Sequence, residues 1–157
     1  MKYVRNLSLV LTLLSAPALA QDPEALNRFR TGYELMQKRS YRNAAIELEQ
    51  AVAIDTSYGN AHYVLAQAYK VLNEYDKAIA SFSAARALGT KPERAAKELG
   101  QLYHKAAISS FGQKKYRTAI GYFQNALEFN PQNAKAHYAM GLSYNGLRET
   151  AKARAAF

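Results

Sequence analysis

The chain has 157 residues, of which 49% are hydrophobic and 21% charged, as expected of one folded domain and not of a disordered chain. It contains no cysteine, which excludes a disulfide framework, a thiolate metal site and a cysteine nucleophile. The formal net charge is +9, and two of those charges, Lys2 and Arg5, lie in the first twenty residues, which leaves +7 for the rest. Because the basic residues are scattered, we expect this charge mainly to keep the protein soluble, although a basic surface also attracts anionic partners.

The first twenty residues have the order of a secretory signal peptide. Lys2 and Arg5 make a positive start, residues 7–14 are largely apolar, and small residues stand at Ala18 and Ala20. We expect cleavage after Ala20, with residues 21–157 forming the mature chain. The apolar run is too short for a stable anchor, and no cysteine is present for lipoprotein attachment. The pattern therefore predicts a periplasmic or secreted protein that is not integral to the membrane, with no nucleic-acid partner.

A helical pattern of tyrosine, alanine and a large apolar residue recurs through the rest of the chain. The first three copies begin at Tyr41, Tyr75 and Tyr116, so the interval before the third is longer than the one before the second. Intervals of this size are typical of stacked repeats, in which one unit alone cannot bury its apolar face. The copies are Tyr41, Ala44, Leu48 and Ala51; Tyr75, Ala78, Phe82 and Ala85; Tyr116, Ala119, Phe123 and Ala126; and, incompletely, Thr150, Ala153 and Phe157.

A second helical pattern precedes each copy, with apolar or small residues at the i, i+3, i+4 and i+7 spacing. It is clear at His62, Leu65, Ala66 and Tyr69 and at His137, Met140, Gly141 and Tyr144, and weaker at Tyr103, Ala106, Ala107 and Ser110 and at Arg28, Thr31, Gly32 and Leu35. The small residues in the middle of these helices (Gly32, Ala66, Ala107, Gly141) allow a neighbouring helix to approach closely. We expect Leu48, Phe82, Phe123 and Phe157 to fill the space between units.

Cap chemistry places the helices at about 23–38, 41–54, 59–72, 75–88, 92–113, 116–129, 133–146 and 149–157. Asp22 can cap the first helix with Pro23 at its first position, and Gly89 can end the fourth. The longer interval before Tyr116 adds the segment 93–99, which spans about two turns and can lengthen the fifth helix without turning its apolar face away. A separate short turn is the alternative.

These residues resemble the tetratricopeptide repeat family, whose unit is a pair of antiparallel helices. Asn130-Pro131 matches the turn between units, where Thr56 and Thr90 replace the proline; the position of the first-helix aromatic holds Arg28, His62, Tyr103 and His137. The resemblance implies an all-α fold, a right-handed α-α superhelix of about three and a half repeats. The units would be 25–58, 59–92, 100–133 and an incomplete 134–157, with 93–99 as a helix extension.

No constellation for catalysis is found. His62 and His137 occupy equivalent repeat positions, which favours packing over metal binding for the histidines, and the chain has no phosphate loop, dinucleotide glycine pattern or zinc-protease motif. We therefore expect no catalytic residues, no cofactor and no bound metal, and a protein that is not an enzyme.

The resemblance implies that the first helix of each unit lines a concave groove for a peptide or protein partner. Aromatic, amide and a few basic groups there could hold a peptide, although some rings could instead pack between helices. Tyr63 and Gln67 replace the residues with which some family members clamp a terminal carboxylate, so that clamp is not predicted. The expected groove residues are Phe29, Tyr33, Met36, Asn60, Tyr63, Gln67, Lys70, Gln101, His104, Ile108, Lys135, Tyr138, Leu142 and Asn145.

The leading hypothesis is thus an exported adaptor or scaffold that binds a protein partner. Two alternatives stay open: the repeat portion of a larger enzyme or assembly factor, and a binder of anionic glycan or cell-wall polymer. The chain stops at Phe157, halfway through the last expected helix. This indicates either a truncated sequence or an edge that meets another subunit, for example in a homo-oligomer.

Overall fold

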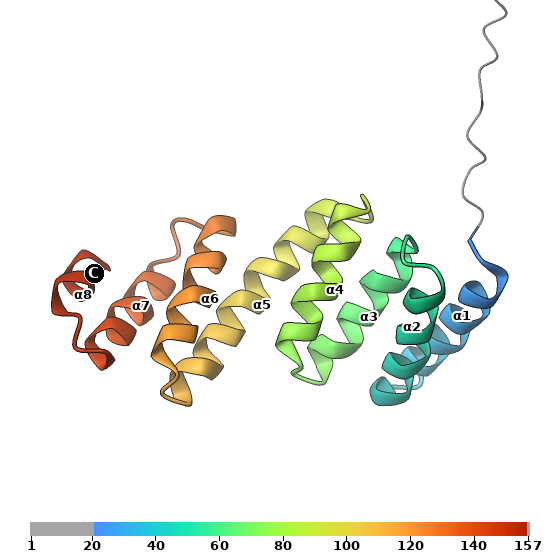
Figure 1. Ribbon diagram of the computed structural model, residues 1–157, viewed down its shortest axis with the longest axis horizontal. Coiled ribbons are helices and arrows are strands. Elements are labelled where there is room, and N and C mark those ends of the chain that lie inside the picture. The colour runs from blue at the N-terminus through green and yellow to red at the C-terminus, as the bar shows by residue number, and fades with distance from the viewer. Residues whose placement is uncertain (1–20, 157) are drawn as a thin grey trace, which may run out of the picture.

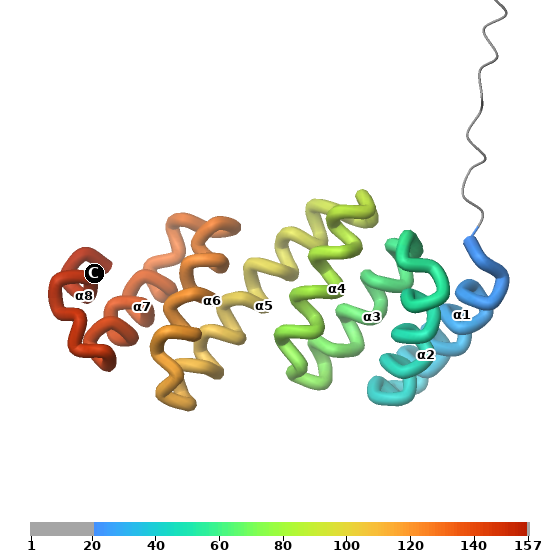
Figure 2. Tube along the Cα trace, viewed as in Figure 1, coloured from blue at the N-terminus to red at the C-terminus, as the bar shows by residue number. Residues whose placement is uncertain are grey.

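The computed structural model describes residues 21–156, so the expected signal peptide, residues 1–20, and Phe157 lie outside the described residues. The described residues form helices and no strands, arranged as antiparallel pairs stacked in one direction (Figure 1). The stack runs from α1 at one end to α8 at the other (Figure 2). This confirms the predicted all-α solenoid. The helices are α1 (Pro23–Gln37), α2 (Tyr41–Ile54), α3 (Gly59–Val71), α4 (Tyr75–Ala87), α5 (Pro92–Gly112), α6 (Tyr116–Phe129), α7 (Ala134–Gly146) and α8 (Thr150–Ala156).

Local cap chemistry fixes where several helices begin and end. The Asp22 carboxylate accepts hydrogen bonds from the backbone N–H groups of Glu24 (2.8 Å) and Ala25 (3.2 Å), and Pro23 follows as the first residue of α1. These bonds satisfy amide groups that the first turn of a helix leaves without partners. At the end of α4, Gly89 has a φ of +71°, and the Thr90 N–H reaches back to the Ala85 carbonyl at 2.8 Å. The predicted roles of Asp22 and Gly89 are confirmed.

The extra residues 93–99 lie inside α5, which is a single helix of 21 residues. The alternative of a separate short turn in this segment is wrong. Ala95 and Leu99 are 0% and 2% exposed and belong to the same apolar cluster as residues of α3 and α4. Because an insertion of about two turns returns the helix to nearly the same face, the added turns continue the apolar stripe and pack back onto the second unit.

The core between helices is built from one large side chain per unit and small residues opposite. Leu48, Phe82 and Phe123 are completely buried. A Cβ placed on Gly32 would lie 2.6 Å from Leu48 Cγ, so α1 and α2 approach as closely as they do only because Gly32 has no side chain. This confirms the packing roles predicted for these four residues.

Two histidine side chains form hydrogen bonds to the turns between units. The Nε2–H of His62 donates to the Thr56 carbonyl at 3.1 Å, and that of His137 donates to the Pro131 carbonyl at 3.0 Å. In both cases the acceptor lies in the turn that precedes the helix. The expected packing role therefore includes a hydrogen bond that fixes the direction in which the chain enters α3 and α7. None of the helices in residues 21–156 combines the length and apolar character required to cross a membrane.

Candidate partner-binding surface

The side chains predicted to line a groove come from α1, α3, α5 and α7, and their exposure differs between units. Seven are exposed: Tyr33, Asn60, Gln101, Ile108, Lys135, Tyr138 and Asn145. Six are half-buried: Phe29, Met36, Gln67, Lys70, His104 and Leu142. Only Tyr63, among the fourteen, is buried.

The prediction that Tyr63 faces a groove is wrong. Its ring is 6% exposed and meets Phe82 edge to face, with the ring centroids 5.3 Å apart. The Lys91 ammonium, at the start of α5, lies 4.6 Å from the centroid of the Tyr63 ring. Lys91 immediately precedes α5, so the turn that leads into this helix lies over the Tyr63 ring.

Lys70 is also engaged by the extended part of α5. Its ammonium lies 2.7 Å from the Glu98 carboxylate, and both side chains are partly shielded from solvent. Because Glu98 belongs to the extra segment 93–99, this ion pair exists only in the lengthened unit. The second unit therefore offers an incoming partner little beyond Asn60 and Gln67.

In the first unit, the predicted aromatic residues partly pack against one another. Phe29 stacks on Tyr33 with a centroid distance of 6.0 Å and lies 5.0 Å from the Tyr58 ring. Tyr58 is buried, whereas Tyr33 is 47% exposed. Phe29 and Met36 also pack against the main apolar cluster. Phe29 therefore packs between helices, as the alternative interpretation predicted, whereas the Tyr33 ring is accessible to solvent.

The third unit and the start of the fourth form an open basic pocket of about 560 Å³. One wall is the face of α5, and the opposite wall is the end of α6 and the turn into α7. A Cβ on Gly100 would lie 2.9 Å from Phe129 Cβ, so the glycine lets the end of α6 approach α5. The polar and aromatic lining residues are Lys97, Gln101, His104, Lys105, Phe129, Asn130 and Asn133.

His104 lines this pocket. Burial lowers its pKa, and the nearby charge of Lys135 lowers the pKa further. The ring lies against Phe123, with the centroids 5.8 Å apart. The Nδ1 atom is buried and has no hydrogen-bond partner among the described residues. The imidazole is therefore a polar group whose hydrogen-bonding capacity the fold leaves unused.

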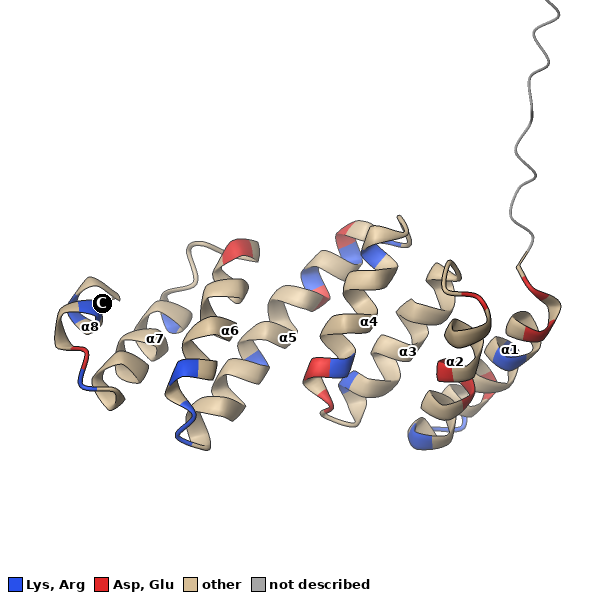
Figure 3. Ribbon diagram, in the orientation of Figure 1, with Lys and Arg blue, Asp and Glu red and all other residues tan. Residues whose placement is uncertain are grey.

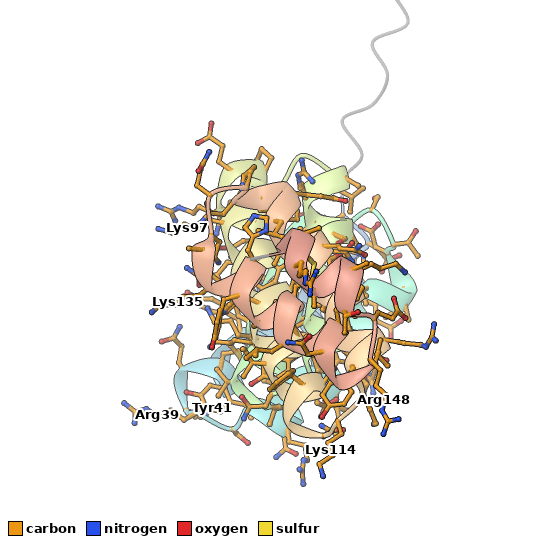
Figure 4. All side chains as sticks on the ribbon, turned by 90° about the vertical axis from the view of Figure 1, so that its left-hand side faces the viewer. Arg39, Tyr41, Lys97, Lys114, Lys135 and Arg148 are labelled. Atoms are coloured by element: carbon orange, nitrogen blue, oxygen red, sulfur yellow. The ribbon has the colours of Figure 1, made fainter. Side chains whose placement is uncertain are left out.

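Three lysines beside the pocket have no acidic partner among residues 21–156: Lys97, Lys105 and Lys135. Viewed along the long axis, Lys97 and Lys135 project from the same side of the array (Figure 4). Lys97 and Lys105 were not predicted as site residues, although Lys97, Gln101 and Lys105 follow the i, i+4, i+8 spacing and so share a helix face. We call Lys97, Gln101, His104, Lys105, Lys135 and Tyr138 the α5–α7 surface.

The charge of the whole chain is divided unevenly between its halves (Figure 3). Residues 21–90 contain eight Lys or Arg and eight Asp or Glu, so their net charge is zero. Residues 91–157 contain eleven Lys or Arg and four Asp or Glu, a net charge of +7. The α5–α7 surface lies in the basic half, where the summed field favours anions.

Within residues 21–156, no three His, Asp or Glu side chains gather closely enough to hold a metal ion. The α5–α7 surface offers three ammonium groups without acidic partners, the Gln101 amide, the half-buried His104 ring and the Tyr138 ring, which is 58% exposed. Groups of this kind can form hydrogen bonds and ion pairs with anionic or peptide ligands.

Comparison with known proteins identifies the repeat. Family models described as "Tetratricopeptide repeat" match residues 29–92, 63–106 and 122–155. Similar solved structures include a crystal structure of MamA, with 26% identity and a TM-score of 0.50 over 87% of this chain and 76% of that one. MamA from Desulfovibrio magneticus RS-1 has 20% identity and a TM-score of 0.50, covering 87% and 73% of the two chains. A structure titled MamA AMB-1 has 17% identity and a TM-score of 0.54, covering 88% and 73%. No curated protein sequence matches this chain.

Proposed function

The chain belongs to the tetratricopeptide repeat family, and from that premise we propose that it is a non-catalytic scaffold that binds an acidic segment of a partner protein on the α5–α7 surface. Repeat arrays of this kind present extended surfaces to their partners. The observation that carries the proposal is the set of three lysines without acidic partners around one open pocket. A protein segment with Asp and Glu side chains would supply the missing charges.

The chemistry of the pocket suits a peptide better than an isolated anion. Lys97, Lys105 and Lys135 can each bind a carboxylate, and the Asn130 side chain can bond to peptide N–H and C=O groups. The Asn133 oxygen already accepts from the Ala136 N–H, so its side chain would bind the ligand as a donor. The exposed Tyr138 ring offers apolar contact. Binding would therefore depend on both the charge and the backbone of the ligand.

The proposed setting is the periplasm or the outside of the cell. It rests on the order of charged, apolar and small residues in positions 1–20, which is that of a cleaved signal peptide. A partner with an exposed acidic stretch in that compartment is the natural candidate. Homo-oligomerisation is part of this proposal only if such a stretch is supplied by a second copy.

The test is fluorescence anisotropy with a labelled peptide rich in Asp and Glu, beside the same peptide with Asn and Gln in their place. The variant is Lys97→Gln/Lys135→Gln, and the matched control is Lys114→Gln/Arg148→Gln, which removes the same charge from another side of the array (Figure 4). We expect the first variant to bind the acidic peptide about tenfold more weakly at low salt, since exposed ion pairs contribute up to about 1 kcal/mol each.

The control variant should bind nearly as well as the wild type. Equal losses in the two variants would mean that only net charge matters and would refute the site. Binding of the Asn and Gln peptide as tight as that of the acidic one would refute the proposed ligand. A pull-down that compares wild type with Lys97→Gln/Lys135→Gln then identifies which captured protein depends on this surface.

A further inference from the structure

A second basic region lies along one edge of the array, away from the α5–α7 surface. It consists of the four turns that join the two helices within each unit, and these turns lie at the same edge (Figure 1). We define this turn edge by four equivalent segments. They are 38–43, 72–77, 113–118 and 147–152.

The turn edge holds most of the net charge of the mature chain. Its four segments contain nine Lys or Arg and three Asp or Glu, a net charge of +6. The turns at the opposite edge, residues 55–58, 88–91 and 130–133, contain one acidic and one basic residue and are neutral overall. The blue segments at the α1–α2, α5–α6 and α7–α8 turns show this difference between the edges (Figure 3).

The acidic residues of the turn edge already have partners. Glu74 pairs with Lys77 at 2.8 Å, Glu149 pairs with Lys152 at 2.7 Å and with Arg117 at 4.0 Å, and Asp76 accepts a hydrogen bond from the Tyr122 hydroxyl. The other basic residues of the edge form no ion pair within residues 21–156. They are Lys38, Arg39, Arg42, Lys114, Lys115 and Arg148, and all six are exposed.

Several of these basic residues occupy backbone conformations or helix positions that are unfavourable for them. Arg39, Lys114 and Arg148 have left-handed backbone conformations, with φ values of 58°, 59° and 62°, which glycine or asparagine adopts more easily. Their charge at a helix C-terminus is favourable, but that reason does not extend to Arg42 and to Arg117, the second residues of α2 and α6.

The N-terminus of a helix is positive, so cations in the first turn oppose the helix dipole. Arg117 has a partner in Glu149 at 4.0 Å. No acidic residue in the first turn of α2 or α6 offsets Arg42 or Lys115, the residue that precedes α6. Folding alone therefore does not account for these charges. Positions that break local rules without a structural gain are expected at functional surfaces.

Shallow pockets separate successive turns along the edge. One, of about 320 Å³, is lined by Arg39, Ser40, Tyr41, Arg42, Asn43 and Leu72. A second, of about 500 Å³ and mixed charge, lies between the α3–α4 and α5–α6 turns and includes Lys77, Lys115, Ser109 and Thr118. Each pocket thus combines ammonium or guanidinium groups with hydroxyl groups, a combination that binds phosphate oxygens.

We propose that the turn edge docks the protein onto an anionic phospholipid bilayer. Basic groups spaced along the edge of an elongated array can meet many headgroups of one surface at once, whereas a single peptide would have to follow the entire edge. The acidic pair in the α3–α4 turn separates the basic turns, so contact at several separate points fits better than one continuous anionic chain. This surface is distinct from the α5–α7 surface, so one molecule can hold a partner while bound to the membrane.

The test is co-sedimentation of the chain from Gln21 with vesicles of phosphatidylcholine alone or mixed with phosphatidylglycerol. All eight helices and the described apolar clusters lie within this chain. The edge variant is Arg39→Asn/Lys114→Asn/Arg148→Asn, which copies Asn73 at the equivalent left-handed position of the second unit. The control is Lys97→Gln/Lys105→Gln/Lys135→Gln, which removes equal charge from the α5–α7 surface. Circular dichroism checks that both variants keep the helicity of the wild type.

We expect the wild type to bind the anionic vesicles, not the neutral ones, and to be released by salt. The edge variant should lose about a hundredfold in vesicle binding, because each Lys or Arg near an anionic surface contributes about fivefold, and it should retain acidic-peptide binding. The control should behave in the opposite way. Equal vesicle binding by the two variants, or binding to neutral vesicles, overturns the proposal. So does edge-dependent binding of soluble dextran sulfate without binding to anionic vesicles, which would instead indicate a site for soluble polyanions.

Discussion

Replacing Tyr63 with alanine should destabilise the fold strongly, whereas the same change at Tyr138 should not. The two residues hold equivalent positions of their repeats, but Tyr63 is 6% exposed and Tyr138 is 58% exposed. Tyr63 packs edge to face on the fully buried Phe82 and belongs to the main apolar cluster. Truncation of a buried aromatic side chain typically costs about 3–5 kcal/mol, through lost burial and the cavity left behind. At a largely exposed position the cost is about 0.5 kcal/mol.

The assay is urea unfolding followed by circular dichroism. With a typical slope of about 1–3 kcal/mol per molar urea, the midpoint for Tyr63→Ala should fall by about 1 M or more. Tyr63→Phe is the matched control, because it keeps the ring and its packing, and it should unfold close to the wild type. A loss below about 1 kcal/mol for Tyr63→Ala, or equal losses at the two tyrosines, would refute the conclusion that the lengthened α5 buries this ring.

Three further outcomes follow from single residues. Gly89→Ala should destabilise by about 1 kcal/mol in urea unfolding, from backbone strain at φ +71° alone, because the added Cβ would meet no atom within 4 Å; an unchanged midpoint would contradict this. The hydrogen bond to Asp76 and burial raise the pKa of Tyr122 to about 12, so Asp76→Asn should lower that pKa in an ultraviolet titration. Because the pKa is higher in the folded state than in the unfolded state, this hydrogen bond contributes its full stabilisation below the unfolded pKa of tyrosine. The stabilisation is lost as pH rises through the folded pKa. Burial, and then the charge of Lys135, lower the pKa of His104, so Lys135→Gln should raise this pKa in an NMR titration, and an unmoved pKa would mean that the two side chains do not face each other.

Features fixed by neighbours in sequence could be predicted without the structure. The start of α1 follows from Asp22 and Pro23, and the end of α4 follows from Gly89, because each depends on backbone groups only a few residues away. The buried state of Phe82 and Phe123 follows from their recurrence at one place in the repeat. The length of α5 could also be predicted, because an insertion of about two turns keeps the apolar residues on the same face of the helix.

What could not be predicted is where the added turns of α5 lie against the preceding unit. Lys70 and Glu98 belong to different helices, far apart in the sequence, and nothing in the local pattern of either one indicates the other. The same holds for Lys91, in the turn before α5, and Tyr63 of α3. Assigning a groove by repeat position assumes that every unit has the same length. The assignment is wrong for Tyr63 because the unit that follows it is longer.

The lengthened helix also divides the array into two parts with different chemistry. Before it, residues 21–90 have a net charge of zero, and in the second unit Tyr63 is buried and Lys70 is paired with Glu98. After it, residues 91–157 carry the entire +7 net charge of residues 21–157, and Lys97, Lys105 and Lys135 have no acidic partner among the described residues. Because Glu98 is taken by Lys70, the one carboxylate on α5 adjacent to Lys97 in sequence is unavailable to it. The insertion thus closes the surface of one unit and leaves the next unit basic and open, which is why an acidic partner should bind at the second half of the array and not along its full length.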